Sequence, residues 1–128
     1  MRSVVICGSR RFKKEVKAFA SDLRRVGVDV YAPHHHSGQE EWNALPKDYQ
    51  TFVALGLTHD HFHKIRLADT VFIYNKGGYA GPGTTLEIGF AVALGKPIYA
   101  LSADSELCRH ALFREVTPSA KELAKRLK

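Results

Sequence analysis

Residues 70–101, TVFIYNKGGYAGPGTTLEIGFAVALGKPIYAL, contain the pattern that decides the fold. An apolar run at 70–74 is followed by a glycine-rich loop at 75–84 and by a mostly apolar helical segment at 85–94. A Gly-Lys-Pro sequence then ends the helix, and a second apolar run occupies 97–101. Two short apolar runs joined through a helix are typical of a parallel β-α-β unit whose strands are buried on both faces.

The same alternation continues on both sides of this unit. The expected strands are 4–7, 28–32, 70–74, 97–101 and 113–116. The expected helices are 13–26, 47–67, 85–94, 104–112 and a last helix capped by Thr117, with 33–46 as loop. Gly56 is expected to interrupt the long helix, with Thr58 capping a new start there. This order predicts an α/β fold: one doubly wound three-layer domain over 1–128, with a five-stranded parallel sheet in the flavodoxin-like order 2-1-3-4-5.

The composition excludes several classes of protein. The 128 residues are 45% hydrophobic and 25% charged, which are ordinary values for a globular domain. No apolar run approaches the ~18 residues that a membrane span needs, and the amino terminus does not resemble a signal peptide. Two cysteines, Cys7 and Cys108, cannot form a disulfide framework. We therefore expect a cytoplasmic protein that does not associate with a membrane. We also expect Cys7 to be a buried strand residue.

The predicted strand order also predicts where a ligand binds. In an open parallel sheet, ligands bind beyond the carboxyl ends of the strands, at the point where the strand order reverses. For the order 2-1-3-4-5 this point lies between the strands at 4–7 and 70–74. The loops that follow these strands, 8–12 and 75–84, are therefore expected to form the site.

The first of these loops has the chemistry of an anion site. Gly8 permits a tight turn and a close approach to a ligand, and Ser9 offers a hydroxyl and a backbone N–H. The helix that follows presents free N–H groups and the positive end of its dipole. Arg10 or Arg11 could add a bidentate contact to a phosphate. A net charge of +6 also favours anionic partners, nucleotides among them.

The second loop ends at a carboxylate in an apolar setting. Gly81, Gly83 and Thr84 are expected to contribute to the same substrate- and phosphate-binding site. Glu87 is the only ionisable residue in the helix that follows, and Thr84-x-x-Glu87 fits a capping box. Backbone donors at the start of that helix would keep Glu87 ionised, as a nucleophile requires. Glu87 is therefore the candidate catalytic nucleophile or base.

Four stretches resemble the nucleoside 2-deoxyribosyltransferase superfamily, which includes deoxynucleoside-monophosphate N-glycosidases. They are ICGS at 6–9, ADTV at 68–71, GTTLEIGFA at 83–91 and ALGKPI at 93–98. The resemblance implies cleavage or transfer of the N-glycosidic bond of a nucleoside or nucleoside 5′-monophosphate. It makes Glu87 the nucleophile of a glycosyl-enzyme, by the logic of retaining glycosidases. It also places a 5′-phosphate on the loop that contains Ser9 and Arg11.

The chain departs from the family pattern at two positions. Val5 stands where many members have a tyrosine that orients the nucleophile, and the family's acidic helix residue falls near Asp60 or His61. Asp60 and His61 are thus both candidate catalytic residues, while Asp69 is interpreted as structural. A nucleotide-binding module without catalysis remains an alternative. So does a phosphoribohydrolase of the type once called lysine decarboxylases, because Gly77-Gly78 precedes the second motif.

The histidines do not form a recognised metal motif. His34, His35 and His36 follow a strand and are expected near the pocket or a subunit contact, while His59 and His63 share a helix face. We therefore expect no metal and no cofactor, and a histidine of the helix that protonates the leaving base. No motif supports nucleic-acid binding. The resemblance implies a homodimer or a larger homo-oligomer.

Overall fold

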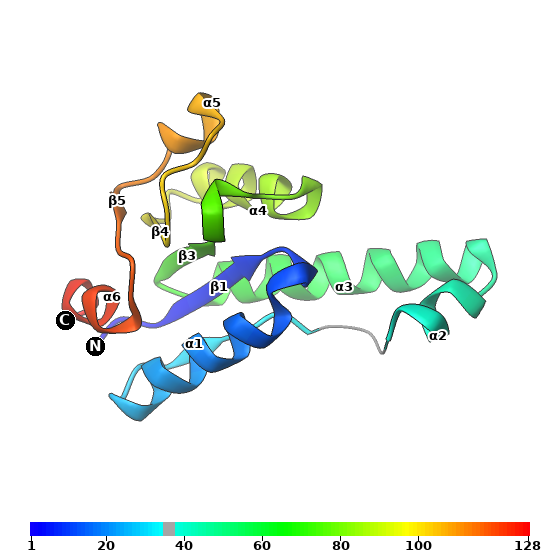
Figure 1. Ribbon diagram of the computed structural model, residues 1–128, viewed down its shortest axis with the longest axis horizontal. Coiled ribbons are helices and arrows are strands. Elements are labelled where there is room, and N and C mark those ends of the chain that lie inside the picture. Colours follow the sequence, from blue (N-terminus) through cyan, green and yellow to red (C-terminus); the bar gives the residue numbers. More distant parts are fainter. Residues whose placement is uncertain (35–37) are drawn as a thin grey trace.

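A computed structural model describes residues 1–34 and 38–128 and contains one five-stranded sheet. The strands are β1 (Val4–Gly8), β2 (Val30–Tyr31), β3 (Thr70–Tyr74), β4 (Ile98–Ala100) and β5 (Glu115–Val116). Every neighbouring pair is parallel, and the order is β2-β1-β3-β4-β5 (Figure 1). The predicted fold class and strand order are confirmed.

The helices connect these strands in the predicted alternation. They are α1 (Lys13–Arg25), α2 (Gln39–Ala44), α3 (Lys47–Leu67), α4 (Pro82–Ala93), α5 (Leu107–His110) and α6 (Ala120–Arg126). Two short 3-10 turns, η1 (Arg10–Phe12) and η2 (Lys76–Gly78), follow β1 and β3. None of the helices in the described part of the chain combines the length and apolar character needed to cross a bilayer.

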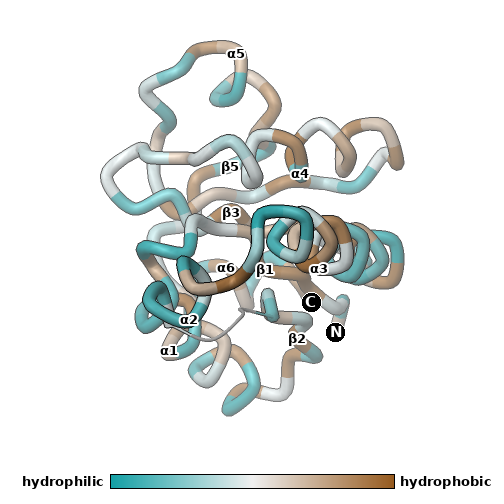
Figure 2. Tube along the Cα trace, turned by 90° about the vertical axis from the view of Figure 1, so that its right-hand side faces the viewer, coloured by the Kyte–Doolittle hydropathy of each residue, from teal (hydrophilic) through white to brown (hydrophobic). Residues whose placement is uncertain are grey.

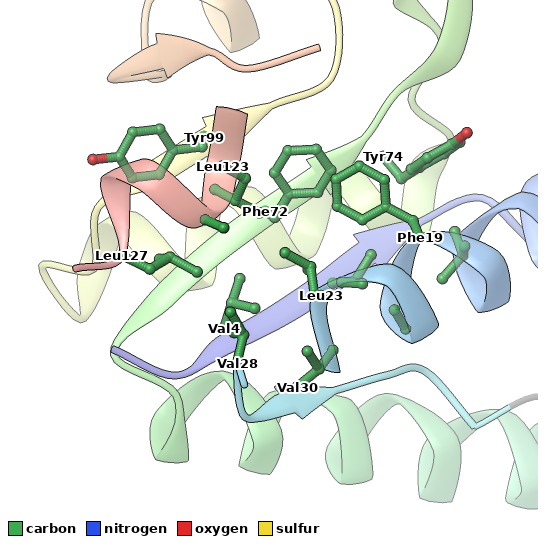
Figure 3. Close-up of a cluster of buried hydrophobic side chains, with 14 of the residues drawn as sticks. Val4, Phe19, Leu23, Val28, Val30, Phe72, Tyr74, Tyr99, Leu123 and Leu127 are labelled. Carbon is green, nitrogen blue, oxygen red and sulfur yellow. The ribbon is translucent and has the colours of Figure 1, made fainter. Parts of the chain in front are cut away.

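The two faces of the sheet are buried in two separate cores. Alternate residues of a strand point to opposite faces, so Val4 and Ile6 of β1 belong to one core and Val5 and Cys7 to the other. The first core lies under α1 and α6, and Figure 3 shows its side chains. The second lies under α3 and α4. Figure 2 shows hydrophobic chain, coloured brown, at β3 in the middle of the molecule.

Apart from β2, β4, β5 and α5, which are shorter than predicted, local structure differs from the sequence prediction in four places. The expected loop 33–46 contains α2, and α3 runs without a break through Gly56. The Thr58 hydroxyl does not cap a new helix, because it donates to the carbonyl oxygen of Ala54, 2.7 Å away. Ser119, rather than Thr117, caps α6 by accepting the N–H of Glu122. The fourth difference, an early start of α4, changes the site and is described below.

Candidate functional site

A pocket of about 320 Å³ lies at the carboxyl ends of β1 and β3, where the strand order reverses. This volume falls at the lower end of the range for small-molecule sites. Its walls come from the loop after β1, the residues after β2, the middle of α3 and the start of α4. The lining residues are Gly8, Ser9, Arg10, Pro33, His34, Leu57, Thr58, His61, Tyr79, Gly81, Pro82, Gly83, Thr84 and Glu87. The pocket therefore lies at the reversal of the strand order, where the sequence predicts it.

The loop after β1 forms one wall. A Cβ atom at Gly8 would lie 3.1 Å from the carbonyl oxygen of Tyr74, so a side chain there would push β1 and β3 apart. Ser9 caps the η1 turn, because its side-chain oxygen accepts the N–H of Arg11 at 3.3 Å. Arg10 lines the pocket beside it. The wall thus combines a hydroxyl, a guanidinium and the start of a helix.

Arg11 has a different position from Arg10. Its guanidinium carbon lies 3.6 Å from the centroid of the Tyr79 ring, in a cation–π contact. Tyr79 also makes an edge-on contact with Phe12, at 6.2 Å between ring centroids. Arg11 is not among the pocket-lining residues, whereas Tyr79 is. Of the two arginines, Arg10 therefore lines the pocket, and Arg11 contacts the aromatic ring beside it.

The start of α4 forms the opposite wall. Gly81 is the N-cap residue, and Pro82 takes a first-turn position, for which its fixed φ is suited. The buried Thr84 therefore lies in the first turn, whereas Glu87 lies in the second. The predicted capping box is wrong, because Pro82 begins the helix before Thr84. Gly83 and Thr84 carry first-turn N–H groups that have no acceptor within the helix, and both residues line the pocket.

Three side chains from three elements converge on the floor of this pocket. Cys7 belongs to β1, His61 to α3 and Glu87 to α4. The Nε2 atom of His61 lies 3.4 Å from the Cys7 sulfur and 3.5 Å from Oε2 of Glu87. Cys7 is fully buried, while the side chains of His61 and Glu87 are 6% and 16% exposed. His61 and Glu87 line the pocket, and Cys7 lies behind them.

Burial controls the protonation of this cluster. Loss of hydration raises the pKa of Glu87 to about 8, because a carboxylate is poorly solvated inside the protein. Burial, followed by the charge of Glu87, raises the pKa of the Cys7 thiol well above its ordinary value. The expectation that backbone donors keep Glu87 ionised is therefore wrong. The second turn of α4 lies beyond the free N–H groups of the helix start.

The other candidate acid, Asp60, lies outside the pocket. Its carboxylate pairs with Lys64 at 2.9 Å, and its side chain is 47% exposed. The hydrogen bond from Lys64 lowers the pKa of Asp60, so Asp60 holds no proton to donate at neutral pH. Asp69 lies at the opposite edge of the sheet, where it accepts the N–H of Ser3 at 2.9 Å. The structural interpretation of Asp69 agrees with this position.

Several pocket residues were not anticipated from the sequence. Leu57 and Thr58 belong to a helix whose orientation a sequence does not reveal. Cys7, which contacts His61 behind the pocket, looks like an ordinary strand residue in the sequence. His34 lines the pocket as expected, whereas His35 and His36 lie outside the described residues. His59 and His63 are exposed on α3 and do not line it.

Comparison with known proteins agrees with the fold and the motifs. The family described as nucleoside 2-deoxyribosyltransferase matches residues 5–121. A conserved protein from Enterococcus faecalis V583 is similar in structure, with a TM-score of 0.64, 17% identity, and coverage of 99% of this chain and 97% of the other. A 2-deoxyribosyltransferase from Bacillus psychrosaccharolyticus has a TM-score of 0.64, 19% identity, and coverage of 95% and 90%.

These identities are too low for the structural likenesses to show more than a shared fold. Comparison with curated protein sequences gave no significant match. The family match is a separate finding, and it spans both loops of the pocket and all of α4. The chain therefore belongs to the nucleoside 2-deoxyribosyltransferase family.

Proposed function

We propose that the protein cleaves or transfers the N-glycosidic bond of a nucleoside or a nucleoside 5′-monophosphate, with Glu87 as the nucleophile. The observation that carries this proposal is the position of Glu87, the only ionisable residue of α4, in the pocket where the strand order reverses. Burying a carboxylate costs free energy unless it is paired, so a carboxylate kept in this position points to a function. Family membership supports glycosyl transfer on nucleosides as that task.

The chemistry requires Glu87 to lose its proton when the substrate is bound. His61 Nε2, 3.5 Å from Oε2 of Glu87, is placed to accept that proton. A Glu87 oxygen then bonds to the anomeric carbon of the sugar while the bond to the base breaks. The electron pair goes to the base nitrogen, which takes the proton from His61. Water, or a second base, finally displaces Glu87 from the sugar as a carboxylate; the proton that the attacking molecule loses goes to His61 and from there back to Glu87.

The walls of the pocket support recognition of a phosphorylated sugar. Ser9 and Arg10 on one side and the first turn of α4 on the other present hydroxyl, guanidinium and N–H donors. The start of α4 therefore faces the pocket, and the positive end of its dipole favours an anion. Tyr79 offers an aromatic ring at the rim for a base or sugar. Gly81 and Gly83 keep that rim free of side chains.

The test is release of free base from a panel of nucleosides and nucleoside 5′-monophosphates. Glu87→Gln keeps the shape of the side chain but removes the nucleophile, and the rate should fall by at least about a thousandfold. Glu41→Gln, on the exposed surface of α2, is the matched control and should keep the wild-type rate. A Glu87→Gln variant that releases base at the wild-type rate would contradict the proposed nucleophile.

Val5 gives a specific reason to keep a second candidate function. It stands where the family resemblance expects a tyrosine, and it is fully buried in the second core, so β1 supplies no hydroxyl there. The alternative is a nucleotide-binding module without catalysis. Calorimetric binding of monophosphates by a folded wild-type protein that releases no base from any substrate would establish this alternative.

A further inference from the structure

The cluster below the pocket has the composition of a metal site. Among the described residues, Cys7, His61 and Glu87 are the group of cysteine, histidine and carboxylate side chains that could hold an ion. Each offers one ligand atom, and the three atoms lie within 4.8 Å of one another. No sequence motif reveals them, because they lie on β1, α3 and α4. The cluster belongs to the proposed catalytic site, yet glycosyl transfer by Glu87 gives Cys7 no task.

Two of the three spacings match those of a shared ion, and the third, between Cys7 and Glu87, is no longer than 4.8 Å. Zn²⁺ binds thiolate at ~2.3 Å and imidazole or carboxylate at ~2.0–2.2 Å, so neighbouring ligands of a tetrahedral site lie roughly 3.3–3.7 Å apart. The observed distances from His61 Nε2 are 3.4 Å to the Cys7 sulfur and 3.5 Å to the Glu87 oxygen. Since Nε2 carries either one hydrogen or one lone pair, it has only one directed bond to share between the two neighbours. A cation among the three atoms would bind all of them at once.

We propose that Cys7, His61 and Glu87 bind a divalent cation of the zinc class, and that this ion inhibits the enzyme by occupying Glu87. Thiolate and imidazole ligands favour zinc over magnesium or calcium. On binding, the thiol loses its proton to solvent, as does Glu87 where it is protonated, and the two anionic ligands neutralise the dication. His61 and Glu87 line the pocket, so the fourth coordination position faces a water or a substrate atom. The inhibition rests on the proposed function, whereas the binding does not.

Cobalt titration tests the binding without any enzymatic assay. The titration uses the full chain with Cys108→Ser, which removes the exposed thiol of α5 but leaves the buried one. Co²⁺ should bind at one ion per chain and give the near-ultraviolet absorption of a cobalt–thiolate bond, and Zn²⁺ should displace it. Sites built from other histidines give no such band, because they contain no sulfur. Absence of the band would overturn the proposal.

Two further variants show which side chains bind the ion. Adding Cys7→Ser should remove the thiolate band, and adding Glu87→Gln should weaken Co²⁺ binding by at least tenfold. Glu87 is partly exposed, so its variant remains informative if substitution of the buried Cys7 impairs folding, which circular dichroism reports. Undiminished Co²⁺ binding by a folded Cys7→Ser or Glu87→Gln protein would contradict the site.

Activity measurements test the inhibition separately. Zn²⁺ should reduce base release by the Cys108→Ser protein, and a chelator should restore it. For each variant, the rate of base release with Zn²⁺ is divided by the rate of the same variant with chelator. This ratio should be well below one for Cys108→Ser and closer to one when Cys7→Ser is added. Faster base release with Zn²⁺ would overturn the inhibitory role. A chelated protein that binds Co²⁺ through Cys7 but releases no base would refute the proposed function and leave the metal site standing.

Discussion

Glu87 is the proposed nucleophile, yet its surroundings disfavour the charged carboxylate. Its carboxyl lies between two helices and the end of a strand, and burial raises its pKa to about 8. A stronger contact with His61 or a bound cation would offset the cost of the charge. The nucleophile proposal and the metal proposal both use this carboxyl group, and it cannot serve both roles at the same moment.

Arg10 and Arg11 are adjacent in sequence but differ in their contacts. Arg10 lines the pocket, whereas the Arg11 guanidinium lies over the Tyr79 ring. Arg10→Ala should raise the KM for a nucleoside 5′-monophosphate roughly 10–100-fold, because one charge-assisted hydrogen bond is lost. The KM for the unphosphorylated nucleoside should change little. Steady-state kinetics on the two substrates measures the difference.

Arg11→Ala is the matched control for this prediction. It removes the same charge from the same loop, and its smaller effect should fall on both substrates alike, since it acts through Tyr79. A selective loss of the phosphorylated substrate in Arg11→Ala, but not in Arg10→Ala, would show that the two arginines have been assigned the wrong way round.

At the scale of the element, α3 shows how a long helix tolerates a glycine. Gly56 lies in its interior and is exposed, and a Cβ atom there would meet nothing within 4 Å. Gly56→Ala should therefore raise the free energy of unfolding by roughly 0.5–1 kcal/mol, because the unfolded chain loses more freedom than the helix does. Urea denaturation measures the change. Gly95→Ala, where φ is +71°, should instead destabilise the protein.

The segment after β4 is hydrogen-bonded to the loop that follows β3. Asn75 is fully buried, and its side chain exchanges two hydrogen bonds with the backbone of Ser102, at 2.8 and 2.9 Å. Asp104 accepts two hydrogen bonds from Arg109, at 2.8 and 2.9 Å, and the Arg109 guanidinium also reaches Thr85 of α4. The position of α4, and of Glu87 on it, thus depends on side chains outside the pocket.

The Asp104–Arg109 pair predicts a pH-dependent contribution to stability. Burial alone would raise the pKa of Asp104, but the hydrogen bonds from Arg109 and from the Glu106 N–H lower it below its ordinary value. Asp104→Asn should therefore reduce the free energy of unfolding near neutral pH by about 1–3 kcal/mol. Since the folded pKa is the lower one, this difference should be present above about pH 4 and shrink as pH falls through the folded pKa.

Urea denaturation of both proteins at a series of pH values measures that contribution. The isosteric amide leaves the packing of the buried side chain nearly unchanged, so the comparison reports mainly on the charge. The wild-type protein and Asp104→Asn differ in their free energy of unfolding. If this difference stays constant as the pH falls well below the ordinary pKa of an aspartate, the assigned ion pair is contradicted.

At the scale of the whole molecule, one end of α3 extends away from the sheet together with α2 (Figure 1). Tyr49, Phe52 and Leu55 recur there at three-residue spacing and are 50%, 69% and 57% exposed. Exposed apolar stripes of this kind mark interaction surfaces. We expect this stripe to be buried between copies of the chain in a homo-oligomer.

Light scattering coupled to size exclusion should therefore give at least a dimer mass. Phe52→Glu should lower that mass, because the charge would have to be buried at the contact. Lys121→Glu changes the charge by two on the exposed surface of α6 and should leave the mass unaltered. A wild-type protein of monomer mass at every concentration would refute the expectation.

The sequence by itself determined the strands, their order and the edge of the sheet that forms the pocket. Apolar runs, glycine-proline helix ends and the crossover rule are local or topological, and they placed the loops after β1 and β3 correctly. The single ionisable residue of the helical segment 85–94 also made Glu87 a candidate, and Glu87 lines the pocket. Local signals failed at Thr58, and at Thr84-x-x-Glu87, where proline began the helix early.

Only the tertiary structure decided which neighbours Glu87 has. Asp60 and His61 are adjacent in sequence, but one step along a helix turns the side chain by about 100°, so one faces Lys64 and solvent while the other faces the pocket. The rotation of α3 on the sheet fixes that choice. Cys7 joins the cluster because β1 packs beneath both helices, and the protonation of Glu87 depends on how much water this packing excludes.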